Sequence, residues 1–315
     1  MDEMSENKAN SFAIVLCCTA DWLPFTAATL LSCVQHGAAE IADLFVMVLG
    51  ACAKDHQIYH EFTNAHGFHV VLIDGVMPPL VDNYPFDRYS KASVLRLTLD
   101  KLLPAKYTRV LYLDSDIIAE GPIADILTVD LKNKSMGAVE DYQSLPHPFN
   151  RFSSYAEKLG LGKGTPYFNS GVMLFDWHKT REKGFLQRGL DRIAAALQQG
   201  HSFKLPDQDV LNLEFVGEWQ RLDLRFNLMA FFVDYFPMKP VFRHFSNRQK
   251  PWGAYWQPGF SQARAFYRET FLNSPWPTFA PRPYQGLSLE GTGGVILRKL
   301  NPFAARRYRA HLERP

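Results

Sequence analysis

The stretch YTRVLYLDSDII, residues 107–118, constrains this chain more than any other. Its apolar run Val110–Leu113 is rich in strand-forming residues and ends at two carboxylates, Asp114 and Asp116, with only Ser115 between them. Acids this close repel each other unless a cation lies between them, and the spacing lets both reach one hard ion such as Mg²⁺ or Mn²⁺. The alternative is a strand followed by a polar turn whose acids are simply solvated.

Composition is that of an ordinary globular protein. The chain has 315 residues, of which 47% are hydrophobic and 21% charged, enough for one large α/β domain or two closely packed halves. A net charge of +2 gives no case for nucleic acid as a partner. The cysteines, Cys17, Cys18, Cys33 and Cys52, show neither metal-ligand nor disulfide spacing, which indicates reduced, buried thiols in a cytoplasmic protein. Residues 1–11 lack the apolar core of a signal peptide, and no stretch is apolar for long enough to span a membrane.

Strand and helix patterns alternate through the first third of the chain. Apolar runs predict strands at 12–18, 44–49, 69–73 and 110–113, and helical patterns lie between them at 25–35, 54–65 and 90–103. This order predicts a parallel, doubly wound sheet. Ligands bind such sheets beyond the carboxyl ends of the strands, which is where Asp114 and Asp116 stand.

The first strand-to-helix turn, residues 17–24, lacks the glycine pattern of dinucleotide-binding proteins. It offers Thr19, Asp21 and Trp22 at the end of a strand, which suits the polar edge and flat base of a nucleoside. The ordinary alternative for Trp22 is a place in the core. The turn therefore predicts a nucleotide site without a dinucleotide fingerprint.

Polar groups also follow strand patterns in the second half. Asp141 comes after a predicted strand at 135–140, and the segment PYFNSGVMLFD at 166–176 is a glycine-containing turn that leads into an apolar strand. An amphipathic helix is predicted at 184–198.

The segment LPDQDVLNLEF, residues 205–215, crowds Asp207, Gln208 and Asp209 before a short helix, a position where acids also simply suit the helix dipole. Further on, HFSNRQKPW contains His244 and Lys250 after a short apolar strand. A structural histidine and a solvated lysine are the ordinary alternatives there. Together with the acids, however, an imidazole and a cation are what a metal and a diphosphate require.

Four motifs carry a resemblance to a known family. LYLDSD, YFNSGVMLFD, LPDQDVLN and HFSNRQKPW, in this order and at this spacing, resemble the family 8 retaining glycosyltransferases, which include bacterial lipopolysaccharide α-galactosyl- and α-glucosyltransferases and glycogenin. The resemblance covers about residues 12–255. It implies a GT-A nucleotide-diphospho-sugar transferase fold, a Rossmann-like mixed α/β sheet flanked by helices.

The resemblance also implies a domain organisation. We expect residues 1–11 to be a disordered N-terminus and residues 12–272 to form the catalytic domain. Within it, 12–125 would be the nucleotide-binding half and 126–272 the sugar and acceptor half. Residues 273–315 would form a basic, aromatic C-terminal tail.

Carried over position by position, the resemblance implies a metal centre and a donor site. Asp114, Asp116 and His244 would hold Mn²⁺, with Mg²⁺ as the alternative. The residues that would contact a UDP-sugar, whether UDP-galactose or UDP-glucose, are Thr19, Asp21, Trp22, Arg96, Ser115, Asn169, Asn247 and Lys250. Those that would act at the transferred sugar are Gln208, Asp207 and Asp141.

Three positions depart from the family pattern. Thr19 stands where the family often has Asp, and Trp22 where it often has Tyr; stacking survives the second change. Asn247 replaces a common Gly, and Asn tolerates the left-handed backbone better than most residues.

The chemistry implied is transfer of galactose or glucose from the UDP-sugar to a saccharide or glycolipid acceptor such as lipopolysaccharide or another cell-surface glycan. A cation and Lys250 would offset the negative charge that develops on the leaving diphosphate. Retention could follow from double displacement with a carboxylate nucleophile. An amide beneath the anomeric carbon, Gln208, favours attack by the acceptor on the same face instead.

The tail RKLNPFAARRYRAHLER, residues 298–314, interleaves basic and apolar residues. This pattern is typical of helices that lie on anionic membrane surfaces, so we expect peripheral attachment to the inner face of the cytoplasmic membrane; a solvated helix end is the alternative. Two rival functions remain open. One is a catalytically lapsed sugar-nucleotide-binding protein, and the other is a haloacid dehalogenase-type phosphatase, which carries its D-x-D on the first strand rather than the fourth.

Overall fold

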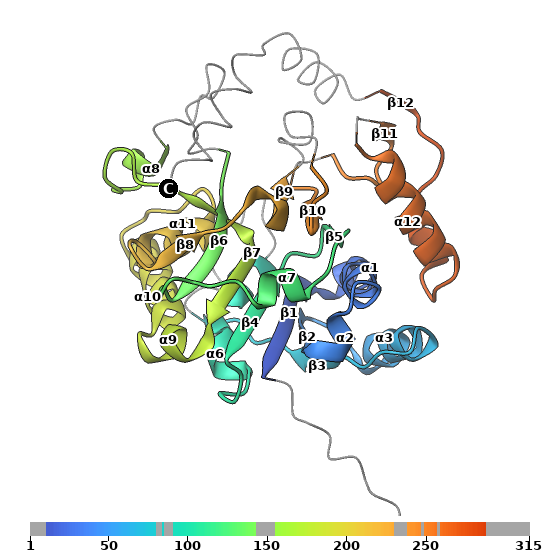
Figure 1. The fold of residues 1–315 in the computed structure, drawn as a ribbon, viewed down its shortest axis with the longest axis horizontal. Helices are drawn as coiled ribbons and strands as arrows, with labels where there is room; N and C mark the ends of the chain where they lie inside the picture. Colours follow the sequence, from blue (N-terminus) through green and yellow to red (C-terminus); the bar gives the residue numbers. More distant parts are fainter. Residues whose placement is uncertain are drawn as a thin grey trace, which may run out of the picture.

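The computed structural model describes residues 11–79, 84, 91–142, 155–229, 238–246, 249–256 and 259–287. Its centre is a seven-stranded mixed sheet in the order β3-β2-β1-β4-β7-β6-β8 (Figure 1). The strands are β1 (Phe12–Thr19), β2 (Asp43–Leu49), β3 (Val71–Asp74), β4 (Arg109–Leu113), β6 (Met136–Glu140), β7 (Phe168–Asp176) and β8 (Trp219–Arg221). The first four run parallel to one another, whereas β7 is antiparallel to both of its neighbours, β4 and β6. The expected Rossmann-like mixed α/β sheet is therefore confirmed.

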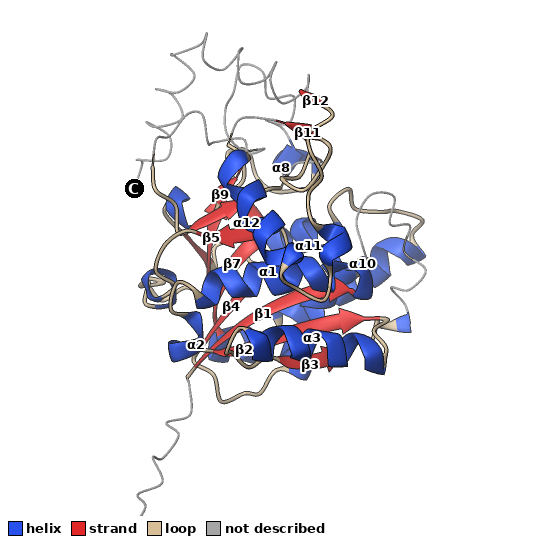
Figure 2. Ribbon diagram, turned by 90° about the vertical axis from the view of Figure 1, so that its right-hand side faces the viewer, coloured by secondary structure: helices blue, strands red, loops and turns tan. Residues whose placement is uncertain are grey.

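Strand β1 divides the core into two layers because its side chains alternate between the two faces of the sheet. Ile14 and Leu16 pack with α1 (Leu23–Val34) and α3 (Ala53–Ala65) on the face that Figure 2 turns toward the viewer. Ala13, Val15 and Cys17 pack on the other face, against residues of a second group of helices. These helices are α5 (Ala92–Leu95), α6 (Leu99–Leu102), α9 (Trp177–Glu182), α10 (Phe185–Gln198) and α11 (Pro206–Glu214). With both faces covered, the strand is apolar from Phe12 to Cys18, as a buried parallel strand requires.

A smaller three-stranded sheet extends the fold beyond the end of β4. It contains β5 (Ile117–Ala119), β10 (Phe242–His244) and β9 (Leu228–Met229), in that order along the sheet from β5. β10 pairs antiparallel with β5, and the register sets His244 opposite Ile117. This pairing brings a histidine from late in the chain to the turn that carries the two aspartates.

Helix α12 (Ser261–Leu272) covers the outer side of α1. Phe25 of α1 lies in an aromatic cluster with Trp252, Tyr267 and Phe271, and its ring stacks on that of Trp252 at 4.3 Å between centroids. Helix α1 is consequently enclosed between the sheet and α12, which explains why a helix with little amphipathic character is buried along almost its whole length.

Shorter elements connect these layers. The helices are η1 (Ala20–Trp22), α2 (Ala38–Ile41), η2 (Arg96–Thr98), α7 (Ala124–Leu127), α8 (Tyr155–Lys158), η3 (Leu224–Phe226) and η4 (Pro277–Phe279). β11 (Tyr255–Trp256) and β12 (Gly286–Leu287) form a separate parallel pair.

Two sequence-based expectations need correction. The helix predicted at 90–103 is broken by the 3-10 turn η2, from which the Arg96 side chain reaches into the interior of the protein. The parallel order predicted for the first third is confirmed for β1 to β4, and the sheet becomes mixed where β7 enters in the opposite direction. Cys52 is exposed rather than buried, since it caps the N-terminus of α3, whereas the other three cysteines are buried as expected.

Other expectations fall outside the residues that the structure describes. They concern residues 1–10, the start of the predicted helix at residue 90, Asn247 and most of the predicted tail, 288–315. Within the described ranges, no helix combines the length and apolarity needed to cross a bilayer.

Candidate metal and sugar-nucleotide site

A cavity of about 610 Å³ opens at the carboxyl ends of β1 and β4. Its volume is in the range of small-molecule binding sites in proteins. The predicted site residues that line it are Thr19, Trp22, Arg96, Asp114, Ser115, Asp116, Asp141, Asn169, Asp207, Gln208, His244 and Lys250. Asp21 lies outside this lining and accepts a hydrogen bond from the Thr19 hydroxyl. Residues predicted from motifs more than a hundred positions apart in the sequence thus meet in one cavity.

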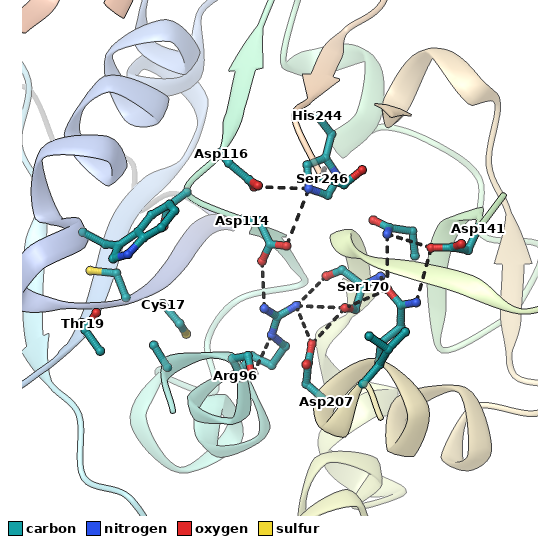
Figure 3. Close-up of a pocket in the computed structure, with 18 of the residues that line it drawn as sticks. Cys17, Thr19, Arg96, Asp114, Asp116, Asp141, Ser170, Asp207, His244 and Ser246 are labelled. Carbon is teal, nitrogen blue, oxygen red and sulfur yellow. Dashed lines mark hydrogen bonds and ion pairs between the residues drawn. The ribbon is translucent and has the colours of Figure 1, made fainter. Parts of the chain in front are cut away.

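Asp114, Asp116 and His244 form a cluster of potential metal ligands, with one ligand atom of each lying within 4.8 Å of the others. The Nε2 atom of His244 is 3.2 Å from Asp116 Oδ1 and 3.9 Å from Asp114 Oδ2 (Figure 3). Two carboxylates and an imidazole are ligands that suit Mn²⁺ and, less selectively, Mg²⁺. The residues present therefore fit a divalent cation.

Helix α1 holds the turn between the two aspartates in place. The Thr29 hydroxyl is 3.1 Å from the carbonyl oxygen of Ser115 and 2.9 Å from that of Ile117, and both can accept its hydrogen bond. The Ser32 hydroxyl accepts a hydrogen bond from Ala119 N–H at 2.9 Å. A rigid buried helix thus fixes the backbone on either side of Asp116.

Strand β7 fixes the other side of the cluster. The N–H of Asp114 donates to the carbonyl of Gly171 at 2.9 Å. A Cβ atom at Gly171 would stand 2.3 Å from His244 Cε1 and 2.9 Å from Asp114 Oδ2, closer than side chains tolerate. Only glycine permits His244 and Asp114 to approach each other here.

Each aspartate of the cluster has a basic partner. Arg96 donates to Asp114 Oδ1 at 2.8 Å and lies 3.1 Å from Asp207 Oδ2, so it joins the two acidic motifs (Figure 3). Its guanidinium also lies 4.3 Å from the ring centroid of Tyr112, whose hydroxyl donates to Asp114. Burial alone would lower the pKa of Arg96, but Asp114 and Asp207 outweigh it and raise that pKa.

Lys250 is the partner of Asp116. Its Nζ atom lies 2.6 Å from Asp116 Oδ2 and 2.6 Å from the carbonyl oxygen of Phe245. Burial alone would raise the pKa of Asp116, but Lys250 and then His244 outweigh it and hold that pKa well below its usual range. Asp116 is therefore ionised at neutral pH and available to a cation.

The opposite wall of the cavity is a network of amides and hydroxyls. Asn169 donates to Asp141 Oδ2 at 3.0 Å, and Gln208 Oε1 accepts from the N–H of Ser170 at 3.0 Å. The Ser170 hydroxyl donates to Asp207 Oδ2 at 3.0 Å. A register shift in β6 next to Glu140 precedes Asp141, and bulges of this kind often re-aim side chains at binding sites.

Trp22 lies at the border between cavity and core. The centroid of its ring lies 5.1 Å from that of Phe25 and 6.1 Å from that of Trp252, and it meets Trp252 edge to face. The thiols of Cys17 and Cys18 line the same end of the cavity, and burial raises the pKa of Cys18 to about 12. Cys18 is therefore an uncharged wall group rather than a nucleophile.

Several contributors were not predicted. Gly171, Ser170, Thr29, Tyr112 and Asn227 position the groups above through the contacts just described or through the His244 ring. The motif YFNSGVMLFD could have singled out Ser170 and Gly171, since both lie in it. Thr29 and Asn227 lie in no motif, and only tertiary contacts show their place.

The arrangement of the sheet matches solved glycosyltransferases. The galactosyltransferase LgtC, solved with donor and acceptor sugar analogues, superposes with a TM-score of 0.67 at 21% identity, covering 81% of this chain and 95% of LgtC. GlyE of Streptococcus pneumoniae gives a TM-score of 0.59 at 16% identity, over 87% of this chain and 66% of GlyE. The fold is that of the GT-A glycosyltransferases.

The family follows from the sequence itself. The chain belongs to glycosyl transferase family 8, whose family model matches residues 13–255. Curated relatives include the lipopolysaccharide 1,2-glucosyltransferase of Escherichia coli K12, 26% identical over 62% of this chain and 58% of the relative. Another is glycosyltransferase GlyF of Streptococcus pneumoniae, 32% identical over 47% of this chain and 34% of GlyF. The chain thus spans about a third to three fifths of the length of these two relatives.

Proposed function

We propose that this glycosyltransferase moves galactose or glucose from UDP to a saccharide acceptor with retention of anomeric configuration, assisted by Mn²⁺. The observation that carries the proposal is the meeting, in one cavity, of a cluster of three potential metal ligands, the cation Lys250 and the amides of Asn169 and Gln208. These three groups match what binds a sugar diphosphate: a metal and a cation contact its phosphates, and amides form hydrogen bonds with its hydroxyl groups.

In this proposal Asp114, Asp116 and His244 hold the cation. When bound, Mn²⁺ or Mg²⁺ would act as a Lewis acid that offsets negative charge on the departing UDP. Lys250, which donates to Asp116 in this structure, would pass from that carboxylate to a phosphate oxygen when the donor binds. The departing diphosphate needs no proton donor, because its charge is already compensated.

The nucleoside end is assigned to the first strand-to-helix turn. Trp22 would face the uracil ring, with Thr19 at the polar edge and Asp21 orienting the Thr19 hydroxyl. Ser115, in the turn between the aspartates, and Asn247 are proposed to contact the donor as well. Residues 12–125 would then be the nucleotide-binding half and 126–272 the sugar and acceptor half.

The sugar end is assigned to Asp141, Asn169, Asp207 and Gln208. Asp207 is engaged by Arg96 and Ser170, which leaves it poorly placed to act as a free nucleophile. Gln208 carries an amide, which is a weak nucleophile. Both features support attack by the acceptor from the face that UDP leaves, with a phosphate oxygen taking the acceptor's proton, over double displacement. A Gln208→Ala variant that turned over at nearly the parent rate would exclude an essential role for this side chain.

The acceptor and location are proposed from sequence and relatives. A lipopolysaccharide core or another cell-surface glycan would be the acceptor, as the names of the Escherichia coli relatives suggest. The basic tail at 298–314 would hold a cytoplasmic enzyme to the anionic inner face of the membrane. Truncation after Pro283 should release the protein from vesicles that contain anionic lipid, and unchanged binding would reject the anchor.

UDP release from a panel of UDP-sugars, with Mn²⁺ present or chelated, tests the proposal directly. We expect one donor to be hydrolysed slowly without acceptor, in a reaction that needs Mn²⁺ and is lost in Asp114→Ala. Mn²⁺-dependent UDP binding without turnover, even with acceptor glycans present, would instead identify a lapsed sugar-nucleotide-binding protein. Absence of both binding and turnover would reject the proposal.

A further inference from the structure

A chain of buried amides joins the metal cluster to the sugar wall. His244 Nδ1 lies 2.9 Å from Asn227 Oδ1, and Asn227 Nδ2 donates to Asn169 Oδ1 at 2.8 Å. Asn227 is fully buried, and His244 and Asn169 are nearly so. The amide of Asn227 must therefore find its partners within the chain rather than in water.

The direction of the Asn169 amide is fixed from both ends. Its Oδ1 atom faces the backbone N–H of Gly171 at 3.0 Å, and a backbone N–H can only donate. Its Nδ2 atom faces Asp141 Oδ2 at 3.0 Å and Gln208 Oε1 at 3.3 Å. Gln208 Oε1 is itself identified as oxygen, because it accepts from the N–H of Ser170. A reversed Asn169 amide would set donors against donors and acceptors against acceptors.

The direction of Asn227 follows from that of Asn169. Since Asn169 presents its oxygen, Asn227 must present its NH₂ group there, and its own oxygen must face His244. An amide oxygen only accepts, so Nδ1 of His244 must carry the hydrogen. Its other ring nitrogen, Nε2, is then the one that faces Asp116 at 3.2 Å and Asp114 at 3.9 Å.

We propose that Asn227 is a positioning residue that keeps a proton on Nδ1 of His244, so that Nε2 is the nitrogen offered to the divalent cation. The proposal rests on the metal site of the proposed function. It adds that the backbone N–H of Gly171 dictates which nitrogen binds, through Asn169 and Asn227. Metal-bound imidazoles generally depend on such a hydrogen bond from the second nitrogen for their orientation.

Loss of the Asn227 oxygen has two unfavourable outcomes for metal binding. If the proton stays on Nδ1, it is buried without an acceptor. If it moves to Nε2, it can be donated to the Asp116 carboxylate, and it then occupies the position that the cation needs. We therefore expect Asn227→Leu to weaken Mn²⁺ binding by about tenfold to one hundredfold.

The parent protein supplies the first test. Nitrogen-15 spectra of histidine-labelled protein with Mg²⁺ and UDP, compared with those of His244→Gln to assign the signals, report which ring nitrogen of His244 carries hydrogen. We expect a protonated Nδ1 and a hydrogen-free Nε2. A His244 whose only hydrogen is on Nε2 would overturn the proposal.

Variants supply the second test, by Mn²⁺ titration in the presence of UDP. Asn227→Asp keeps an oxygen for Nδ1 but cannot donate to Asn169, so its Mn²⁺ affinity should stay within a few-fold of the parent while that of Asn227→Leu falls. Asn212→Leu is the matched control, because Asn212 is an equally buried amide, bonded to Phe168 and Gln208 rather than to His244. It should lower the melting temperature without changing Mn²⁺ affinity.

The outcomes separate this inference from the proposed function. A parent that binds no Mn²⁺ would remove the metal site and, with it, both statements. If the parent binds Mn²⁺ and Asn227→Leu binds it equally tightly, the inference alone is overturned. If Asn227→Leu does not fold, the parent spectrum and the Mn²⁺ affinity of Asn227→Asp decide. Because Asn227→Asp retains an acceptor for Nδ1, a loss of affinity larger than a few-fold in this variant would overturn the inference.

Discussion

This protein contains two pairs of aspartates in which one residue separates the two acids, and the two pairs lie in different environments. Asp114 and Asp116 both face the cavity, where each meets a basic side chain. Asp207 also faces the cavity, but Asp209, two residues on, is fully buried and accepts hydrogen bonds from Tyr155 and Tyr167. The first pair belongs to the candidate metal site. In the second pair Asp207 lines the cavity, whereas Asp209 stabilises the interior of the protein.

Backbone conformation accounts for the difference. Asp114 and Asp116 occupy the turn between β4 and β5, where both side chains can converge on one point. Asp207 and Asp209 lie in the first turn of α11, where residues two apart project about 200° apart around the helix axis. A D-x-D motif predicts a shared ligand only where the chain is not helical.

The largest expected effect separates the pairs by activity. Asp116→Ala should reduce Mn²⁺-dependent transfer by about a thousandfold, because it removes a proposed ligand of the candidate metal centre. Asp209→Asn, which keeps the size of the buried side chain, should retain activity to within about tenfold. Initial rates of UDP release compare the two. Equal losses in both variants would show that the pairs do not differ as described.

Asp209 should matter more for the stability of the protein than for its activity. Asp209→Ala leaves two tyrosine hydroxyls and the N–H of Leu205 without their acceptor, and we expect it to lower the free energy of unfolding by about 3 kcal/mol. Denaturant titration measures this loss. Asp191→Ala, on the exposed side of α10, is the control and should change the value by less than about 0.5 kcal/mol. A loss no larger than that of the control would contradict the supporting role.

The pH dependence of stability should identify Asp209 as well. Burial raises its pKa to about 6, against the hydrogen bonds from Tyr167, Leu205 and Tyr155 that lower it. The folded state thus binds this proton more tightly than the unfolded state, so its contribution is complete below about pH 4 and is lost as pH rises through 6.

Asp209→Asn should abolish that part of the profile, which amounts to about 3 kcal/mol. Unfolding free energies at pH 4, 5, 6 and 7 for parent and variant provide the measurement. Parallel profiles would show that Asp209 does not titrate in this interval.

The smallest expected effect tests how the metal turn is held. Thr29→Val removes the hydroxyl that bonds the carbonyls on both sides of Asp116, and should weaken Mn²⁺ binding by about fivefold, equivalent to about 1 kcal/mol. Thr29→Ser should restore it. Thr180→Val is the matched control, because Thr180 is an equally buried threonine bonded to the Ser135 carbonyl, away from the cavity. Similar losses in both valine variants would indicate general destabilisation.

Much of the fold could be predicted from the sequence because its strands are covered on both faces. Apolar runs such as 12–18 and 44–49 correspond to β1 and β2 to within a residue or two. Direction could not be predicted for β7, since an antiparallel strand buried on both faces has the same apolar pattern as a parallel one. The break in the helix at Arg96 also depends on contacts that the local sequence does not encode.

The candidate site could be predicted where its residues lie in sequence motifs. Asp114, His244 and Lys250 belong to segments whose order and spacing are characteristic of the family. Nothing local marks Asn227, which lies between η3 and β9, and its place follows only from its hydrogen bonds to His244 and Asn169. Asp207 and Asp209 look alike until the helix that carries them is known.

The antiparallel pairing of β10 with β5 also bears on the order in which the protein assembles. It joins residues about 125 positions apart, and contacts that close so long a loop are costly in chain entropy and tend to form late. The parallel core β1–β4 needs only the first 113 residues, so helical and sheet structure can precede the metal cluster. During refolding, we expect Mn²⁺ affinity to recover after the far-ultraviolet circular dichroism signal. A nascent chain would then pass through a stage that is folded in part and still unable to bind a metal ion.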